Sequence, residues 1–308
     1  MKVLITSNSF GKYSDDAEKL LADNNFEIIK NKYHRMMNEG EFIEEIKDVD
    51  GVILSTESLN KNVIDHAKKL KIVSRYGVGI DNIDTEYLKE KGIELRTAKN
   101  CNNVAVAEYA VGLIINIVRK ISVANRSVRN NKWSKEVGID VNNSTVGIIG
   151  LGSIGREVAK RLSNFGCKLI SYDLFYDDEF CNRYKIHKVS LDTLLKESHI
   201  ITLHLPSLNS DKPLLSKREF ELMKEGVVII NTARADLIDT EEVLANLEKG
   251  KIFGYAFDVH KDEPNIDLRF AKYDNVVMTP HNAAVSKGAV DKMSYVSAKN
   301  IIDFFNGK

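Results

Sequence analysis

The sequence has few cysteines and lacks the features of an exported or membrane-spanning chain. Its three cysteines, Cys101, Cys167 and Cys181, are irregularly spaced and form no CxxC pair. We therefore expect reduced thiols rather than disulfides or metal ligands, as is usual in the cytoplasm. No apolar run approaches the ~18 residues that a membrane-spanning helix needs, and the N-terminal stretch MKVLITSNSF is too short and too polar for a signal peptide. These absences predict a cytoplasmic protein without a metal site.

The chain also lacks an excess of charge of either sign. Acidic and basic residues number 44 each among 308 residues. This balance gives no reason to expect binding to nucleic acid or to an anionic membrane. Apolar residues make up 43% of the chain and charged residues 29%, a composition typical of a soluble globular protein. The length predicts two domains of ordinary size.

Short apolar segments alternate with helical patterns along the chain. A first series of segments, rich in Val and Ile and bounded by polar residues, predicts strands over residues 2–7, 26–30, 51–54, 71–76 and 93–97. A second series covers residues 145–150, 168–173, 199–205, 227–233, 252–259 and 275–280. Strands that alternate with helices favour parallel sheets covered on both faces. We therefore predict an α/β fold with two doubly wound parallel sheets.

Two helical segments flank the second series of strands. One covers residues 104–119, and the other is the tail, residues 285–305. The second sheet is already complete by Pro280. The tail is therefore available to pack back on the first unit, an arrangement that the pattern permits without requiring it.

A glycine-rich stretch lies near the middle of the chain. Residues 145–166, TVGIIGLGSIGREVAKRLSNFG, have the order strand, turn, helix, which is that of a dinucleotide-binding loop. Gly150 permits the tight turn, Gly152 lets the backbone approach a pyrophosphate, and Gly155 lets helix and strand pack closely. The alternative is a strand–turn–helix corner that binds no nucleotide.

The residues around this loop favour the nucleotide interpretation. Ser153 and Ile154 begin the helix, whose first N–H groups and positive dipole end suit phosphate groups. Asp173 ends the next strand, 18 residues after Gly155, and a carboxylate near that spacing accepts hydrogen bonds from an adenosine ribose diol. It would repel the 2′-phosphate of NADP, and no arginine follows it directly. We therefore predict NAD as the cofactor.

Three residues with chemically useful side chains follow strands of the second series. They are Arg234 in NTARADLID, Glu263 in YAFDVHKDEP and His281 in VVMTPHNAA. Ligands of open α/β sheets bind at the carboxyl ends of the strands. A guanidinium holds a carboxylate and polarises a carbonyl, an imidazole passes a proton, and a neighbouring carboxylate favours the charged imidazole. Singly, each residue fits an ordinary surface charge; together they predict a site that interconverts 2-keto and 2-hydroxy acids.

These motifs resemble those of the D-isomer-specific 2-hydroxyacid dehydrogenase family over nearly the whole chain. The matching stretches are RYGVGIDNID (75–84), VAVAEYAVGL (104–113), GIIGLGSIG (147–155), NTARADLID (231–239), DVHKDEP (258–264) and TPH (279–281). Within the family, the pattern is closest to phosphoglycerate dehydrogenase-like members without a regulatory domain. The resemblance implies a catalytic triad of Arg234, Glu263 and His281.

The resemblance also implies a domain organisation. A flavodoxin-like substrate domain, residues 1–99 with 284–308, would receive an inserted Rossmann NAD-binding domain, residues 100–283, with a cleft between the two. Members of the family are commonly homodimers that pair through the NAD-binding domain. The helix after Val104 and the segment around Trp133 would form that contact.

Further contacts are implied for the substrate and the cofactor. The N–H groups of Val78 and Gly79 would bind the substrate carboxylate, and Asn102 matches an asparagine of a substrate loop. Asp258 would face the nicotinamide amide, with Thr232–Ala233 nearby.

Two positions depart from the family pattern. Ala235 follows the catalytic arginine and Ala283 follows the TPH motif by one residue, and at both positions the family usually has glycine. Each alanine adds one methyl group near the cleft. Because this is the smallest change available, we expect it to be tolerated.

Arg75 bears on the identity of the substrate. It directly precedes the predicted carboxylate-binding loop, and the resemblance to phosphoglycerate dehydrogenases favours 3-phosphoglycerate. The stretch 51–64, however, lacks the arginine that those enzymes carry, and Glu57 would repel a phosphate. Hydroxypyruvate, glyoxylate or a larger 2-keto acid are therefore the alternatives, and Arg75 would then be an ordinary strand-end charge.

Two alternative functions, from other classes of protein, fit the same motifs. An NAD(H)-sensing protein similar to the dehydrogenase-like transcriptional corepressors would keep the triad, but this chain begins directly with a strand and carries no disordered extension. Formate dehydrogenases pair the histidine with a glutamine, whereas the matching residue here is Glu263.

Overall fold

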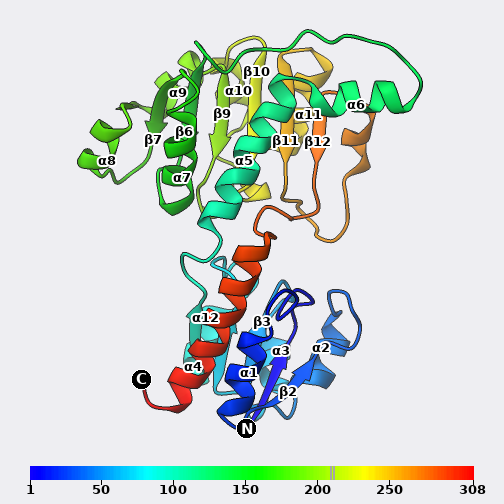
Figure 1. The fold of residues 1–308 in the computed structure, drawn as a ribbon, viewed down its shortest axis with the longest axis vertical. Helices are drawn as coiled ribbons and strands as arrows, with labels where there is room; N and C mark the ends of the chain where they lie inside the picture. The colour runs from blue at the N-terminus through cyan, green and yellow to red at the C-terminus, as the bar shows by residue number, and fades with distance from the viewer. Residues whose placement is uncertain (209, 211) are drawn as a thin grey trace. The chain divides into compact units, whose positions relative to one another are not determined.

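The chain leaves its first unit once, builds a second unit and returns to the first (Figure 1). The computed structural model describes residues 1–208, 210 and 212–308. The first unit comprises Met1–Asn102 and Ala284–Lys308, and the second comprises Asn103–Ala283. Each unit has its own sheet and its own core.

The sheet of the first unit is parallel throughout the described residues. Its strands are β1 (Lys2–Ile5), β2 (Glu27–Lys30), β3 (Gly51–Leu54), β4 (Ile72–Arg75) and β5 (Glu94–Thr97). They pair in the order β2-β1-β3-β4-β5, which is the flavodoxin-like order. All strands predicted for this unit are confirmed; β3 has the predicted bounds, and the other four are one or two residues shorter than predicted.

Helices cover both faces of this sheet. They are α1 (Asp16–Asp23), α2 (Glu39–Ile46), α3 (Lys61–His66), α4 (Thr85–Glu90) and α12 (Lys287–Phe305). The side chains of Asn38, Asn60 and Asp84 accept backbone N–H groups at the starts of α2, α3 and α4, which satisfies donors that a helix start leaves unpaired. The returning helix α12 packs on α1 and β4 (Figure 1). The tail thus packs on the first unit, an arrangement that the sequence pattern left open.

The described part of the second unit forms a seven-stranded parallel sheet. Its strands are β6 (Thr145–Ile149), β7 (Lys168–Tyr172), β8 (Ile186–Lys188), β9 (Ile200–Leu203), β10 (Val227–Asn231), β11 (Ile252–Phe257) and β12 (Val276–Met278). The order is β12-β11-β10-β9-β6-β7-β8. The order reverses at β6, and nucleotides bind at such a point in doubly wound sheets.

The edge strand β8 is the one strand that the sequence did not indicate among the described residues. It is three residues long, and of these Ile186 alone is buried. So short a segment shows no detectable alternation of apolar and polar residues. The predicted doubly wound α/β fold is otherwise confirmed.

The helices of the second unit lie on both faces of its sheet. They are α5 (Asn103–Val118), α6 (Ile121–Arg129), α7 (Ser153–Leu162), α8 (Asp178–Arg183), α9 (Leu191–Glu197), α10 (Lys217–Leu222) and α11 (Thr240–Glu248), with short 3-10 helices η1 (Ala235–Leu237) and η2 (Leu268–Lys272). The helix α5 packs on α7, β10 and β11 through a buried apolar face that includes Ala107, Ala110 and Ile114. Among the described residues, none of the helices has both the length and the apolar character that a membrane span requires.

Candidate active site

The three glycines of the loop after β6 have different surroundings. Gly150 has a φ of +93°, and a Cβ there would lie 2.7 Å from the carbonyl oxygen of His204. A Cβ on Gly155 would lie 2.0 Å from the carbonyl oxygen of Gly150. Beside Gly152, by contrast, an added Cβ would have no described heavy atom within 4 Å. The fold itself therefore requires Gly150 and Gly155, whereas the open space at Gly152 is what a pyrophosphate needs.

The start of α7 and the end of β7 flank this open space. Gly152 precedes α7 without a side-chain cap, and the helix begins at Ser153 and Ile154. The Asp173 carboxylate accepts hydrogen bonds from the N–H groups of Leu151 and Phe175, so it is fixed beside the glycine loop. Uncapped helix N–H groups suit phosphates, and a carboxylate at this position suits a ribose diol. These residues fit a dinucleotide.

The predicted triad residues lie at one edge of the second sheet. Arg234, Glu263 and His281 follow β10, β11 and β12, which are adjacent parallel strands. The His281 Nδ1 lies 3.0 Å and 2.8 Å from the two carboxylate oxygens of Glu263. With the Nδ1–H donating to Glu263, the Nε2 atom is left for proton exchange with a substrate.

The Glu263 carboxylate is held in its ionised form. Burial raises its pKa, but the hydrogen bond and charge of His281 and the N–H group of His260 outweigh burial, so its pKa lies below the usual value. The His260 N–H donates to Glu263 Oε1 at 2.9 Å. An ionised carboxylate at this distance accepts the Nδ1–H of His281 and fixes the orientation of its ring.

Asp258 anchors the turn that carries His281. Its carboxylate is buried and accepts hydrogen bonds from Thr279 Oγ1 at 2.6 Å, Asn282 N at 2.8 Å and Ala283 N at 2.7 Å. His281 has a φ of +51°, in the left-handed region that costs a residue with a side chain roughly 1–2 kcal/mol. The three bonds to Asp258 stabilise this turn. The predicted contact of Asp258 with a nicotinamide stays a prediction.

A buried asparagine fixes the turn that carries Arg234. Asn231 ends β10, its Nδ2 donates to the carbonyl of Arg234 at 2.8 Å, and its Oδ1 accepts the N–H of Ala233 at 3.0 Å. The hydroxyl oxygen of Thr232 is buried without a hydrogen-bond partner among the described residues. Because buried polar atoms are normally paired, this hydroxyl suits a polar group of a ligand.

The two alanines that replace family glycines adopt ordinary backbone conformations. Neither Ala235 nor Ala283 has a positive φ. Ala235 begins η1, and Ala283 donates its N–H to Asp258. Neither position therefore depends on the conformational freedom of glycine, in keeping with the expected tolerance.

The predicted substrate-binding residues of the first unit follow β4 and β5. The N–H groups of Val78 and Gly79 donate to no other group in the described chain, so they are available to a carboxylate. The Asn102 side-chain oxygen is buried and has no hydrogen-bond partner among the described residues. The Arg75 guanidinium contacts backbone carbonyls, Leu54 O at 3.1 Å and Gly79 O at 2.6 Å.

Three residues that the sequence did not single out support the site. His260 donates to Glu263, Asn231 holds the Arg234 turn, and Thr279 joins Asp258 to the His281 turn. Only Asn231 carries a signal in the sequence, since it is a polar residue that ends an otherwise apolar strand. The other two contacts depend on how β11 and β12 pair.

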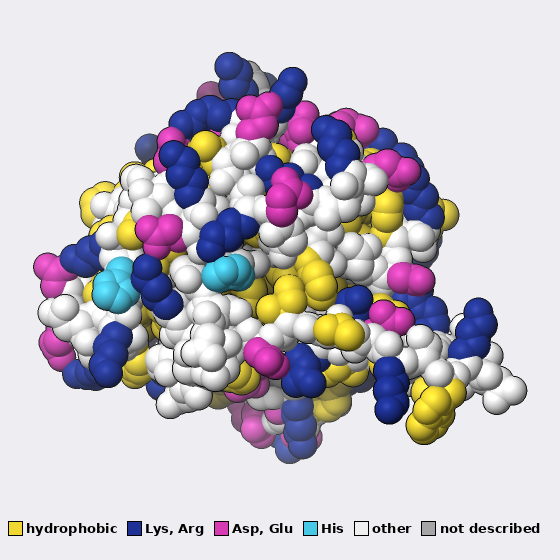
Figure 2. All heavy atoms as spheres, turned by 90° about the horizontal axis from the view of Figure 1, so that it is seen from above, with side chains coloured by type: hydrophobic (Ala, Val, Ile, Leu, Met, Phe, Trp, Pro, Cys, Tyr) yellow, Lys and Arg dark blue, Asp and Glu magenta, His cyan; other side chains and the backbone are white. Residues whose placement is uncertain are grey.

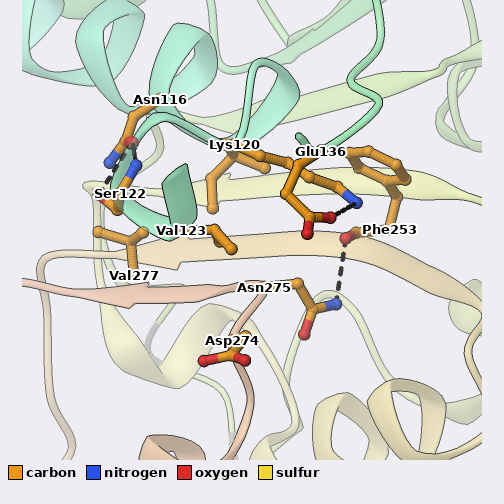
Figure 3. Close-up of a pocket in the computed structure, with 10 residues that line it drawn as sticks. Asn116, Lys120, Ser122, Val123, Glu136, Phe253, Asp274, Asn275 and Val277 are labelled. Carbon is orange, nitrogen blue, oxygen red and sulfur yellow. Dashed lines mark hydrogen bonds and ion pairs between the residues drawn. The ribbon is translucent and has the colours of Figure 1, made fainter. Parts of the chain in front are cut away.

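Two cavities lie in the second unit, and the larger one is lined in part by His260, which donates to Glu263. One, of about 140 Å³, is lined by residues of α5 and α6 and by residues near the amino ends of β11 and β12, including Lys120, Glu136, Phe253 and Asn275 (Figure 3). His281 follows the carboxyl end of β12, the opposite end of that strand. The other, of about 700 Å³, lies beside η1, α11 and the segment 259–270. Among the described residues, no predicted site residue lines either cavity.

Comparison with known proteins identifies the family. The family model described as "D-isomer specific 2-hydroxyacid dehydrogenase, NAD binding domain" matches residues 111–283. D-3-phosphoglycerate dehydrogenase of Archaeoglobus fulgidus is 34% identical over 311 residues, which cover 100% of this chain and 58% of the relative. The chain thus spans little more than half the length of that relative. Glyoxylate reductase of Thermococcus litoralis is 33% identical over 279 residues, which cover 87% of this chain and 84% of the relative.

Solved structures share the fold. D-lactate dehydrogenase from Aquifex aeolicus, in complex with NAD and lactic acid, has a TM-score of 0.85 at 27% identity and covers 99% of this chain and 96% of its own. The apo-structure of D-lactate dehydrogenase from Escherichia coli has a TM-score of 0.88 at 26% identity, with coverages of 100% and 98%. The chain belongs to the D-isomer-specific 2-hydroxyacid dehydrogenase family, and residues 111–283 are its NAD-binding domain.

Proposed function

We propose that this chain is an NAD-dependent dehydrogenase that interconverts a 2-keto acid and the corresponding D-2-hydroxy acid. The observation that carries the proposal is the His281–Glu263 pair, with Nδ1 to Oε2 at 2.8 Å, at the same sheet edge as Arg234. This edge belongs to a family NAD-binding domain. It combines a cation for a carboxylate, a proton donor and a group that keeps that donor charged.

The residues of the glycine loop would hold the cofactor. Gly152 and the first N–H groups of α7, from Ser153 and Ile154, would bind the pyrophosphate, and Asp173 would bind the adenosine ribose. Thr232–Ala233 and Asp258 would lie at the nicotinamide. When bound, the nicotinamide supplies a hydride to the carbonyl carbon, or accepts one in the oxidative direction.

The side chains of the triad bind the substrate and move one proton. Arg234 would hold the substrate carboxylate and polarise its carbonyl group. As the carbonyl oxygen gains negative charge, His281 Nε2 would donate a proton to it, which forms the hydroxyl group. Glu263 stabilises the charged imidazole before that transfer. In the oxidative direction, the neutral imidazole takes the hydroxyl proton, and the same carboxylate stabilises the imidazolium that results.

The relatives favour two of the candidate substrates, and hydroxypyruvate and larger 2-keto acids are the others. The relative from A. fulgidus favours 3-phosphoglycerate, and the relative from T. litoralis favours glyoxylate. NADH oxidation against glyoxylate, hydroxypyruvate, pyruvate and larger 2-keto acids, with NAD reduction by 3-phosphoglycerate in parallel, separates them. We expect turnover on at least one acid. Tight NADH binding without turnover on any acid would contradict the proposal and support an NAD(H)-sensing protein.

Replacement of Glu263 by glutamine is expected to shift the pH dependence of reduction. Glutamine keeps the shape and still accepts a hydrogen bond from His281, but it removes the negative charge that favours the protonated imidazole. Since reduction requires the protonated form, the midpoint of the pH profile, above which the rate falls, should move to lower pH in E263Q. The measurement is the pH profile of kcat/KM for NADH-dependent reduction. A midpoint that matches the wild type would show that the Glu263 charge does not govern His281.

We also propose that the chain acts in the cytoplasm as a homodimer that pairs through its second unit. The helix α6 and the residues after it expose Ile121, Val128, Trp133 (88% exposed) and Val137 (85% exposed). Figure 2 shows this segment at the right of the view, with apolar and basic side chains on its surface. Lys120 pairs with Glu136 at 3.4 Å and ties the segment to the turn after α5 (Figure 3). Exposed apolar residues grouped in this way are typical of a protein interface.

Replacement of Trp133 and Val137 by serine is expected to convert the dimer into a monomer. Both side chains are almost fully exposed in the single chain, so their loss should leave the fold intact and remove apolar contact area from the interface. Sedimentation or light scattering gives the mass. Phe175→Ser is the matched control, because Phe175 is 83% exposed on the turn after β7. A double variant with the mass of the wild type would contradict this interface.

A further inference from the structure

We propose that Arg75 is a positioning residue that clamps the loops after β3 and β4, rather than a group that binds a substrate phosphate. The inference rests on the proposed function, since it assigns a role within the same substrate-binding machinery. It also changes what the presence of Arg75 implies about the substrate. If Arg75 acts on the backbone, its presence is no evidence for a phosphorylated acid.

Two nitrogens of the Arg75 guanidinium, Nε and Nη1, bind backbone carbonyls of the first unit. Its Nε donates to the carbonyl of Gly79 at 2.6 Å, and its Nη1 donates to the carbonyl of Leu54 at 3.1 Å and to that of Ser55. A Cβ added to Gly77 would lie 3.8 Å from the guanidinium carbon. The side chain thus folds back over the loop that follows β4 and reaches the end of β3.

Further hydrogen bonds join the same two loops. Asn82 Nδ2 donates to the carbonyl of Glu57 at 2.6 Å, and the N–H of Leu59 donates to the carbonyl of Asn82 at 2.8 Å. Leu59 and Ile83 form an isolated parallel bridge. Arg75 fixes the start of each loop, and these contacts fix the segment beyond. The two loops therefore form one hydrogen-bonded assembly.

The loop after β1 belongs to this assembly through a buried carboxylate. Glu57 is 2% exposed, and its Oε2 accepts a hydrogen bond from Thr6 Oγ1 at 2.5 Å. The same Thr6 oxygen accepts the N–H of Ser55 at 2.8 Å. Burial raises the pKa of Glu57, while the Thr6 hydroxyl, nearby backbone N–H groups and the charge of Arg75 oppose that rise. The Glu57 carboxyl group thus lies near the Arg75 guanidinium, and in its ionised form it makes these surroundings less attractive to a phosphate.

The clamp acts on the two N–H groups that are available to a ligand. Those of Val78 and Gly79 donate to no other group in the part of the chain that the structure describes. The Gly79 carbonyl is tied to Arg75 Nε, which restricts rotation of the backbone at Gly79. Donors fixed before binding cost no ordering when a carboxylate arrives. Arg75 would therefore act on every 2-keto acid through the carboxylate that all of them share.

The test compares phosphorylated and unphosphorylated acids in Arg75 variants. Arg75→Met should lower kcat/KM at least about tenfold, as expected for loss of charged hydrogen bonds, and should do so equally for 3-phosphoglycerate and for an unphosphorylated D-2-hydroxy acid. Arg75→Lys keeps the charge but not the planar fork that reaches two loops, so it should stay impaired. Arg96→Met is the control, because Arg96 lies on the neighbouring strand β5 and pairs with Glu94.

Two results would overturn the inference. One is a selective loss of activity on 3-phosphoglycerate in Arg75→Met, together with recovery in Arg75→Lys, because lysine also binds phosphate well. The other is unchanged amide hydrogen exchange over residues 76–80 in Arg75→Met, since loss of a clamp must loosen that loop. The exchange measurement needs no turnover. It therefore tests the clamp whether the wild type turns over both classes of acid, one class or neither. Absence of turnover on any acid would contradict the proposed function, but it would leave the exchange test of the clamp intact.

Discussion

Replacement of His281 by alanine is expected to lower kcat by about 10²- to 10⁴-fold, the usual contribution of a positioned proton donor. The imidazole is the group that Glu263 orients, with Nδ1 2.8 Å from the carboxylate, and its other nitrogen is the proposed proton donor. His281 lies after β12, whereas the glycine loop follows β6. Affinity for NADH should therefore stay near that of the wild type. Steady-state NADH oxidation and a fluorescence titration of NADH measure the two quantities.

His187 provides the matched control for this variant. It is an exposed histidine on the edge strand β8, four places from β10 in the sheet order. His187→Ala should retain the kcat of the wild type. If His281→Ala also retained kcat, the assignment of proton transfer to His281 would be wrong.

Gly152→Ala is expected to weaken NADH binding, whereas Gly155→Ala is expected to lower the free energy of unfolding. In Gly152→Ala, the new methyl group meets no described heavy atom within 4 Å, so the free energy of unfolding should change little. The methyl group would, however, occupy the space that the pyrophosphate needs. We expect NADH affinity to fall at least about tenfold, which corresponds to loss of about 1.4 kcal/mol of binding free energy.

In Gly155→Ala, the methyl group would lie 2.0 Å from the carbonyl oxygen of Gly150. Both residues belong to the corner between β6 and α7, and its backbone must shift to relieve the clash. We expect a loss of about 1–3 kcal/mol in the free energy of unfolding, seen as a lower denaturation midpoint. Gly152→Ala with NADH affinity equal to the wild type would contradict the pyrophosphate assignment. Equal stability of Gly155→Ala and the wild type would contradict the packing argument.

The strands of both sheets were predictable from local pattern, and most of the supporting contacts of the site were not. Buried parallel strands such as β3 and β10 are continuous runs of apolar residues, which short windows of sequence detect. The edge strand β8 has one buried residue and gives no such run. The loop glycines were recognisable because their spacing follows from strand, turn and helix in direct succession.

The contacts that hold the site depend instead on pairings between distant segments. The hydrogen bonds that Asp258 accepts from the N–H groups of Asn282 and Ala283 exist because β11 and β12 pair in register. The resemblance placed Asp258 near a nicotinamide, but not on the His281 turn. Likewise, the sequence placed Arg75 beside the substrate loop but did not predict the orientation of its side chain. That orientation is set by hydrogen bonds to the carbonyls of Leu54 and Gly79.

We propose that hydride and proton exchange with a 2-keto acid takes place at the edge of the second sheet that carries His281. The most direct measurement is NADH oxidation by the wild-type chain against a panel of 2-keto acids, with NADH binding measured on the same sample. We predict saturable turnover of at least one acid and its loss in His281→Ala. NADH binding without turnover of any acid, 3-phosphoglycerate oxidation included, would contradict the account.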